Sequence, residues 1–204
     1  MPDATKITLS SQELKIVEDT SWVLTKQEII KTVYEIFNCQ VLLIGEVVLE
    51  EKDQLPVEIL SVIPKISRGE NYQGLPYVML DYPSIFQKDN IFALRTMFWW
   101  GNFFSVTLHL SGRNKVYFEE NIIKNLTTYT SDGLFLCINY DAWEHHFKAD
   151  NYVPLEVLSI LELRDYIFNK HFLKIALKIE LRQWNNLNEF LPPAYKQILK
   201  LLSR

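Results

Sequence analysis

Apolar and polar residues alternate most clearly in the middle of the chain, over residues 92–112 (FALRTMFWWGNFFSVTLHLSG). Two runs rich in β-branched and aromatic residues flank Gly101-Asn102, a dipeptide that suits the two-residue turn of a tight hairpin. The pattern therefore predicts two antiparallel strands joined at this dipeptide. Pairing outward from a two-residue turn places Trp100 opposite Phe103 and fixes the register of the whole hairpin.

Side chains alternate between the two faces of a strand, so this register predicts a hairpin with two unlike faces. The first face is apolar apart from Arg95, and we expect it to lie in the core: Trp99, Met97, Ala93, Phe104, Val106, Leu108 and Leu110. The second face mixes aromatic and polar residues: Trp100, Phe98, Leu94, Phe103, Thr96, Ser105, Thr107 and His109. A mixed face of this kind suits a covered groove or a binding surface. The residues predicted to bind a ligand are Phe98, Trp100, Phe103, Thr107 and His109, together with Arg95.

A helix-start signature occurs three times outside the hairpin. Each copy has a hydroxyl residue as a possible N-cap, a glutamate three positions later, and an apolar pair that can staple the first turn. The copies are Leu9-Ser10 with Glu13-Leu14, Leu24-Thr25 with Glu28-Ile29, and Leu158-Ser159 with Glu162-Leu163. They predict helices that begin near Ser11, Lys26 and Ile160 and end near Thr20, Leu49 and Trp184. A last helix is expected to begin at Pro193, because proline is tolerated in a first turn.

Prolines and glycines divide residues 56–83 into short pieces, which argues against a long helix there. We expect a strand, or a short helix and then a strand, over 57–66, a loop over 67–76, and a strand over 77–82. A helix is predicted over 116–126 and a short internal strand over 134–140. The order of helices, strands and helices predicts an α+β fold with a mainly antiparallel sheet. We expect one domain over 1–204, with helical parts at 10–50 and 159–203 around a sheet region at 57–147.

Composition narrows the class of protein. The 204 residues are 48% hydrophobic and 23% charged, with a formal net charge of −4, so a globular and mildly acidic domain is expected. No dense cluster of lysine and arginine is present, which disfavours nucleic acid and anionic membranes as partners. The N-terminus lacks the layout of a secretion signal, and Val41–Leu49, the longest apolar run, is interrupted by Glu46. A soluble cytosolic protein is therefore expected, and Cys39 and Cys137 are expected to be buried free thiols.

Motifs for common enzymes are missing. The sequence contains no phosphate-binding glycine loop, nucleophile elbow or zinc-binding His-Glu-x-x-His. The best metal candidates are Asp141, His145 and His146, to which His109 could be added. Because adjacent residues on a strand point to opposite faces, His145 and His146 would bind one ion only if the segment turned. No cofactor is predicted.

Two polar residues of the hairpin have alternative interpretations. Arg95 cannot lose its charge, so a buried position would require a partner such as Asp81 or Glu70, or else an anionic ligand. His109 shares a strand face with Thr107, which resembles part of a nucleophile–base pair but has no identifiable third member.

The sequence favours a non-catalytic domain that binds a small apolar-aromatic ligand or a protein partner on the mixed hairpin face. An inhibitor-type partner of a basic protein would belong to this class. The alternative is a small enzyme, such as a metal-dependent hydrolase, that uses His109 with the segment 141–146. The two hypotheses differ in whether His109 and the residues of that segment converge.

Overall fold

The computed structural model describes residues 8–128 and 132–204. Within these ranges the α-helices are α1 (Ser11–Glu18), α2 (Thr20–Glu50), α3 (Val57–Leu60), α4 (Gly112–Thr128), α5 (Ile160–Asn169) and α6 (Leu187–Lys200). The strands are β1 (Lys65–Tyr72), β2 (Leu75–Gln87), β3 (Asn90–Trp99), β4 (Phe103–Ser111), β5 (Leu134–Cys137), β6 (Tyr152–Pro154) and β7 (Phe172–Glu180). Short 3-10 helices lie at Lys52–Gln54, Leu155–Val157 and Leu181–Asn186.

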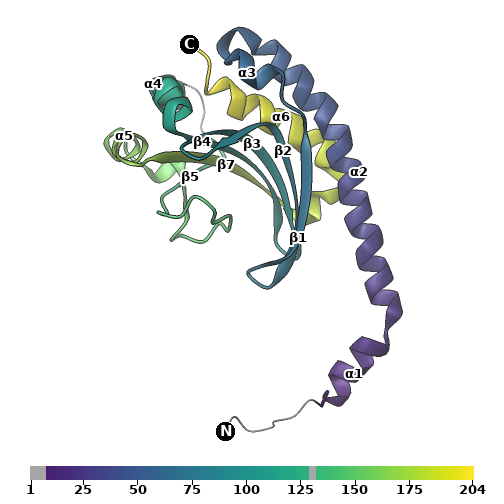
Figure 1. Cartoon of the computed structure of the whole chain (residues 1–204). Coiled ribbons are helices and arrows are strands. Elements are labelled where there is room, and N and C mark those ends of the chain that lie inside the picture. The colour runs from purple at the N-terminus through teal and green to yellow at the C-terminus, as the bar shows by residue number, and fades with distance from the viewer. Residues whose placement is uncertain (1–7, 129–131) are drawn as a thin grey trace.

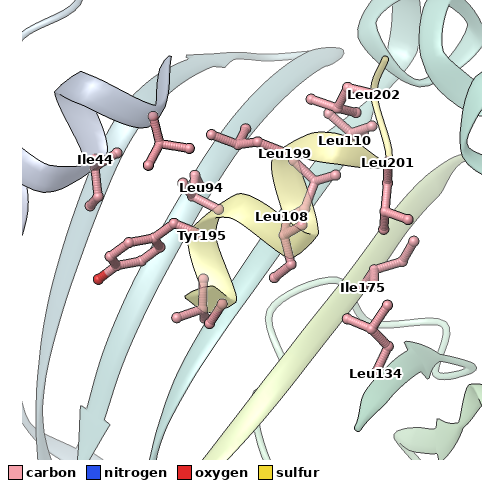
Figure 2. Packing of buried hydrophobic residues seen from close by; sticks show 14 of the residues in the cluster. Ile44, Leu94, Leu108, Leu110, Leu134, Ile175, Tyr195, Leu199, Leu201 and Leu202 are labelled. Carbon is pink, nitrogen blue, oxygen red and sulfur yellow. The ribbon is translucent and has the colours of Figure 1, made fainter. Parts of the chain in front are cut away.

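The seven strands form one antiparallel sheet in the order β1-β2-β3-β4-β7-β5-β6, and the α+β fold is the predicted one. Helices α2, α4 and α6 pack against one face of this sheet (Figure 1). Figure 2 shows how Tyr195 and Leu199 of α6 meet Leu94 and Leu108 of the sheet, while Ile44 joins them from α2. This helix-covered face contains the main hydrophobic core.

Two of the three predicted helix starts are confirmed. Ser10 and Ser159 each accept a hydrogen bond from the backbone amide three residues later, and the glutamate at that position bonds back. Thr25 was predicted wrongly as a cap, because α2 already begins at Thr20 with the carboxylate of Asp19 as its cap. The Thr25 hydroxyl instead donates to the carbonyl oxygen of Ser21, one turn earlier in the same helix.

The hairpin of residues 92–112 is confirmed, but its predicted register is wrong by one residue. Trp99 pairs with Phe103, so the connecting loop has three residues, Trp100 to Asn102, in place of the two predicted. The side-chain period of a strand is two, and a slip of one residue therefore exchanges the faces of one strand relative to the other. As a result, Phe98 lies on the helix-covered face with Phe104, and Trp100 also packs against the core of that face.

The opposite face of the hairpin holds Arg95, Met97 and Trp99 from β3 together with Phe103, Ser105, Thr107 and His109 from β4. We call this side of the sheet the polar face. It unites the odd-numbered residues of both strands, which the predicted register had separated. Trp99 donates from its indole nitrogen to the carbonyl oxygen of Tyr72, so its polar atom is satisfied although the ring is buried.

Three other segments differ from their predictions. The helix expected from Ser159 to Trp184 ends at Asn169, and β7 follows it as the partner of both β4 and β5. Residues 67–76 form most of the β1–β2 hairpin and are not a long loop. Helix α6 begins at Leu187, before Pro192 and Pro193, because its first turns already bury apolar side chains in the core.

Helix α2 is the element that is long and apolar enough to cross a membrane by length and composition, within the part of the chain that the structure describes. Ile30, Phe37 and Ile44 on its inner side are buried in the main core. A single helix of this kind is weak evidence of a membrane span, because the core helix of a soluble protein or a signal sequence can have the same length and composition. Cys39 lies on the exposed side of α2, contrary to the prediction, whereas Cys137 is buried and both thiols are free.

Candidate functional site

The polar face is covered by residues 138–151, the connection between β5 and β6, which we call the cover segment. This segment contains no regular secondary structure, so its backbone groups need partners elsewhere. The side chain of Lys174 in β7 supplies two of them, because its Nζ donates to the carbonyl oxygens of Ala142 at 2.9 Å and Glu144 at 2.5 Å. The cover segment is thus attached to the centre of the sheet.

Tyr72 at the end of β1 makes the second attachment. Its hydroxyl oxygen accepts hydrogen bonds from the backbone amides of His145 at 2.7 Å and His146 at 3.0 Å. The same hydroxyl donates to Oε2 of Glu144 at 2.8 Å. Burial, supported by Glu144, raises the pKa of Tyr72 to about 12, so the proton for this bond is retained at neutral pH.

Trp143 projects from the cover segment and lines two pockets, one toward β1–β3 and one toward β4 and β7. The pocket toward β1–β3, which we call the aromatic pocket, has a volume of about 540 Å³ and is lined by Lys65, Ser67, Tyr72, Tyr77, Met79, Asp81, Phe86, Arg95, Trp143 and His145. The pocket toward β4 and β7, which we call the histidine pocket, has a volume of about 550 Å³ and is lined by Lys88, Ile91, His109, Ser111, Tyr140, Asp141, Ala142, Trp143, His171 and Phe172. The two pockets share the Trp143 side chain as a wall.

An ion pair forms part of the aromatic pocket. Arg95 donates from Nε to Oδ1 of Asp81 at 2.7 Å and from Nη2 to Oδ2 at 3.0 Å, which confirms the predicted partner. The guanidinium also lies 5.6 Å from the centre of the Phe86 ring, whose own neighbour at 6.3 Å is Trp143. The aromatic pocket therefore combines a rigid, paired charge with flat apolar walls.

His109 in the histidine pocket is 4% exposed, and its Nε2 has no hydrogen-bond partner among the described residues. The imidazole lies edge-on to Trp143 and Phe172, at centroid distances of 5.7 and 6.0 Å. Burial, with smaller contributions from the positive charges of Lys174 and Arg95, lowers the pKa of His109 to about 3. Its imidazole is therefore neutral at physiological pH.

The predicted ligand-binding residues are divided between the two faces of the sheet. Arg95 and His109 reach the two pockets, whereas Phe98 and Trp100 belong to the helix-covered core. Phe103 lies on the polar face, where its ring meets that of Phe147 in the cover segment at 5.0 Å, centroid to centroid.

Thr107 is on the polar face too, but it is buried beneath the cover segment beside Tyr152. Burial raises the pKa of Tyr152 well above its ordinary value, and a hydrogen bond with Thr107 opposes that rise. The hydroxyls of Thr107 and Tyr152 therefore bond to each other on the polar face.

The metal candidates do not form one group, although His109 and Asp141 both line the histidine pocket. Asp141 lines the histidine pocket, whereas His145 lines the aromatic pocket, where burial lowers its pKa well below the ordinary value. His146 is buried, with Nε2 3.4 Å from Glu144 and Nδ1 3.9 Å from Asp150. The described residues contain no group of three histidine, cysteine or acidic side chains that could hold a metal ion.

Three residues that organise the site were not among the predicted ones: Tyr72, Trp143 and Lys174. Lys174 lies in the run Phe172–Glu180, where a lysine at every fourth position also fits the outer side of a helix. An alternation of apolar residues from Leu173 to Ile179 is present in the same run and would have placed Lys174 on a strand face. The partners of Tyr72 and Trp143 come from distant segments, so no local sequence signal indicates them.

A scan against protein-family models and searches of curated proteins and of solved structures found no match to this chain. The functional argument therefore depends on the site itself.

Proposed function

We propose that this protein is a non-catalytic binding protein that holds a small aromatic ligand in the aromatic pocket. The observation that supports this most is a pocket of about 540 Å³ whose lining combines the rings of Tyr72, Tyr77, Phe86 and Trp143 with a paired arginine. Small-molecule sites commonly have volumes of about 300–1,000 Å³ and combine mostly apolar walls with a few fixed polar groups. This function retains the predicted class of protein but moves the binding site away from Phe98 and Trp100.

The lining residues indicate the chemistry of the ligand. A planar ring fits beside Trp143 and Phe86, because aromatic groups pack edge-to-face or offset at the distances found between these two rings. Lys65 and Arg95 bring two positive charges to the pocket against the single carboxylate of Asp81. A ligand with one negative charge, such as an aromatic carboxylate, would complement the remaining positive charge.

The enzymatic alternative relied on His109 as a base. A general base works best when its pKa is near the operating pH, whereas burial holds the pKa of His109 at about 3. A neutral imidazole of such low basicity can accept or donate a hydrogen bond but is poorly suited to remove a proton. The low basicity of His109 therefore favours binding over the enzymatic alternative, and a cytosolic location remains part of the proposal.

The test uses 2-naphthoate as the probe and titration calorimetry as the measurement. Trp143→Ala should weaken binding at least about fivefold, because stacking of a planar base on one aromatic side chain contributes about 1–3 kcal/mol. Trp22→Ala is the matched control, because Trp22 is 55% exposed and Trp143 53%, and Trp22 lies outside both pockets. The control should bind the probe as the wild type does.

A second pair of measurements tests the charge. Lys65→Gln should weaken the binding of 2-naphthoate but leave the binding of the uncharged 2-naphthamide unchanged. Failure of the wild type to bind either probe with a Kd below about 1 mM, which corresponds to about 4 kcal/mol, would refute the proposal. Equal losses in Trp143→Ala and Trp22→Ala would also refute it, because the probe would then not distinguish the pocket from the surface.

A further inference from the structure

The N-terminal part of the described chain leaves the body of the molecule as a projecting arm (Figure 1). We define the arm as residues 9–25, which comprise α1 and the first turns of α2. None of these residues is buried, and its large apolar side chains are 46–67% exposed: Leu9, Leu14, Ile16, Val17, Trp22, Val23 and Leu24. The first ion pair between α2 and the sheet joins Lys26 to Glu70 at 2.6 Å, directly after the arm.

Helix α1 lacks the packing that normally stabilises a helix of its length. It has eight residues, and isolated helices shorter than about 12–15 residues are marginally stable in water. Helix α5 provides an internal comparison, because it starts with the same capping arrangement but buries Leu163 and Ile167 in the core. The apolar side chains of the arm therefore require an external surface to cover them.

The charge of the arm restricts what that surface can be. Glu13, Glu18 and Asp19 outnumber the single cation Lys15. Pairing one arm with another would bring acidic residues together, and an anionic membrane would repel them. A complementary surface should be apolar and carry positive charge.

Such a surface lies at the other end of α2 on the same chain. A groove of about 380 Å³ is lined by Pro56, Glu58, Ile59, Ile85, Gln87, Asn90, Arg113, Asn114 and Tyr117. Three further apolar residues of the same segments are exposed: Val57 in α3, Ile63 after α3 and Val116 in α4.

Two cations border this groove. Arg113 lines it directly, and Arg204 donates to the Tyr117 hydroxyl at 2.9 Å with its guanidinium over the ring. Glu58 is the one acidic residue among its lining residues. The groove thus combines the apolar surfaces of Pro56, Ile59, Ile85 and Tyr117 with polar side chains, and its two arginines outnumber its one carboxylate, which complements the apolar and acidic arm.

We propose that the arm of one copy occupies the groove of a second copy, and that the exchange is reciprocal. Arm and groove lie at opposite ends of α2, which spans about 45 Å for its 31 residues. Two copies arranged antiparallel bring each arm to the other copy's groove around one two-fold axis. A closed two-fold assembly would place apolar side chains of each arm in the other copy's groove, and two-fold symmetry is the most frequent symmetry of soluble oligomers.

The test is sedimentation equilibrium of the full chain over a range of concentrations, with charge-reversal variants. Glu18→Lys and Arg113→Glu should each raise the dimer dissociation constant at least about tenfold, and the double variant should restore it to within about threefold. Both changes favour their own helices, because Glu18 ends α1 and Arg113 begins α4, where lysine and glutamate respectively suit the helix dipole. A loss of association therefore does not arise from a loss of helix.

Val17→Ser tests the apolar contribution and should also weaken the dimer. Its matched control is Leu161→Ser, which changes a more exposed residue of α5 outside the arm and the groove and should leave association unchanged. A wild-type chain that remains monomeric at about 0.5 mM, a dimer unaffected by Arg113→Glu, or a double variant that fails to recover would each overturn the proposal. Binding of 2-naphthoate provides an independent readout, because the aromatic pocket shares no lining residue with the groove.

Discussion

Replacing His109 by phenylalanine should make the protein more resistant to acid. In the folded chain the pKa of this imidazole is about 3, whereas a histidine in the unfolded chain has a pKa of about 6.5. Between these values the unfolded chain binds a proton that the folded chain does not bind. The free energy of unfolding therefore falls as the pH is lowered through 6.5, by up to about 1.4 kcal/mol per pH unit.

The size of the effect can be stated for an accessible range. From pH 7 to pH 5 the wild type should lose about 2 kcal/mol through this group, and His109→Phe should not incur that loss. At pH 7 the variant should be at least as stable as the wild type, because it removes a buried Nε2 without a partner and keeps an aromatic ring beside Trp143.

Urea denaturation at pH 7, 6 and 5 measures the free energy of unfolding of wild type and of His109→Phe. The contributions of the other titrating groups cancel when one free energy is subtracted from the other. Ser105→Ala is the control, because it alters another buried residue of the same face that does not titrate in this range. A difference between His109→Phe and wild type that stays constant from pH 7 to 5 would show that the imidazole takes up its proton over the same pH range in the folded and unfolded chains, contrary to the reasoning.

Three further changes test the attachment of the cover segment, the junction between β4 and α4, and the core. Burial lowers the pKa of Lys174 to about 8 from 10.5, so wild type should gain about 2 kcal/mol relative to Lys174→Met between pH 8 and 9.5, as measured by guanidinium denaturation. Gly112→Ala should lower the free energy of unfolding by at least about 2 kcal/mol in urea denaturation, because φ is +56° and the new Cβ would lie 1.9 Å from the backbone oxygen of Asp89. Gly133→Ala is its control and should lower the free energy of unfolding by less, because Gly133 also has a positive φ but no such clash. Tyr195→Phe should cost about 1–2 kcal/mol by thermal denaturation because the buried Thr96 hydroxyl, 2.9 Å from the Tyr195 oxygen, loses its partner, and adding Thr96→Val should recover part of the loss.

The hairpin shows how far the alternation of apolar and polar residues determines which side chains share a face of the sheet. The alternation within each strand was read correctly, since Phe98 and Thr96 do share a face, as do Thr107 and His109. What the sequence did not reveal was whether the loop has two residues or three. That single residue decides which side of β4 joins which side of β3, so the predicted mixed face combined residues from both sides of the sheet.

The secondary structure of Phe172–Glu180 was predicted wrongly for a different reason. Its apolar residues fit a helical period with Phe168, and they equally fit the alternation of a strand. Pairing with β4 on one side and β5 on the other decides between the two, and those partners lie far away in sequence. The same long-range pairing brings Lys174 under the cover segment, which explains why neither the strand nor its role was predicted.

The two faces of the sheet differ in what their side chains can contribute to stability. On the helix-covered face, apolar side chains from α2 and α6 fill the space, and each is stabilised simply by leaving water. On the polar face, Lys174 and His109 are buried and Tyr72 is half-buried, and hydrogen bonds offset the cost of removing these polar groups from water for Lys174 and Tyr72 but not for Nε2 of His109.

A sheet selected for stability alone would be expected to carry apolar residues at these positions, since burying polar groups rarely improves on apolar packing. Lys174 and Tyr72 instead hold the backbone of residues 142–146, and with it the cover segment that carries Trp143, in one place on the sheet. Under the proposed function, these bonds would fix the wall of the aromatic pocket before a ligand arrives.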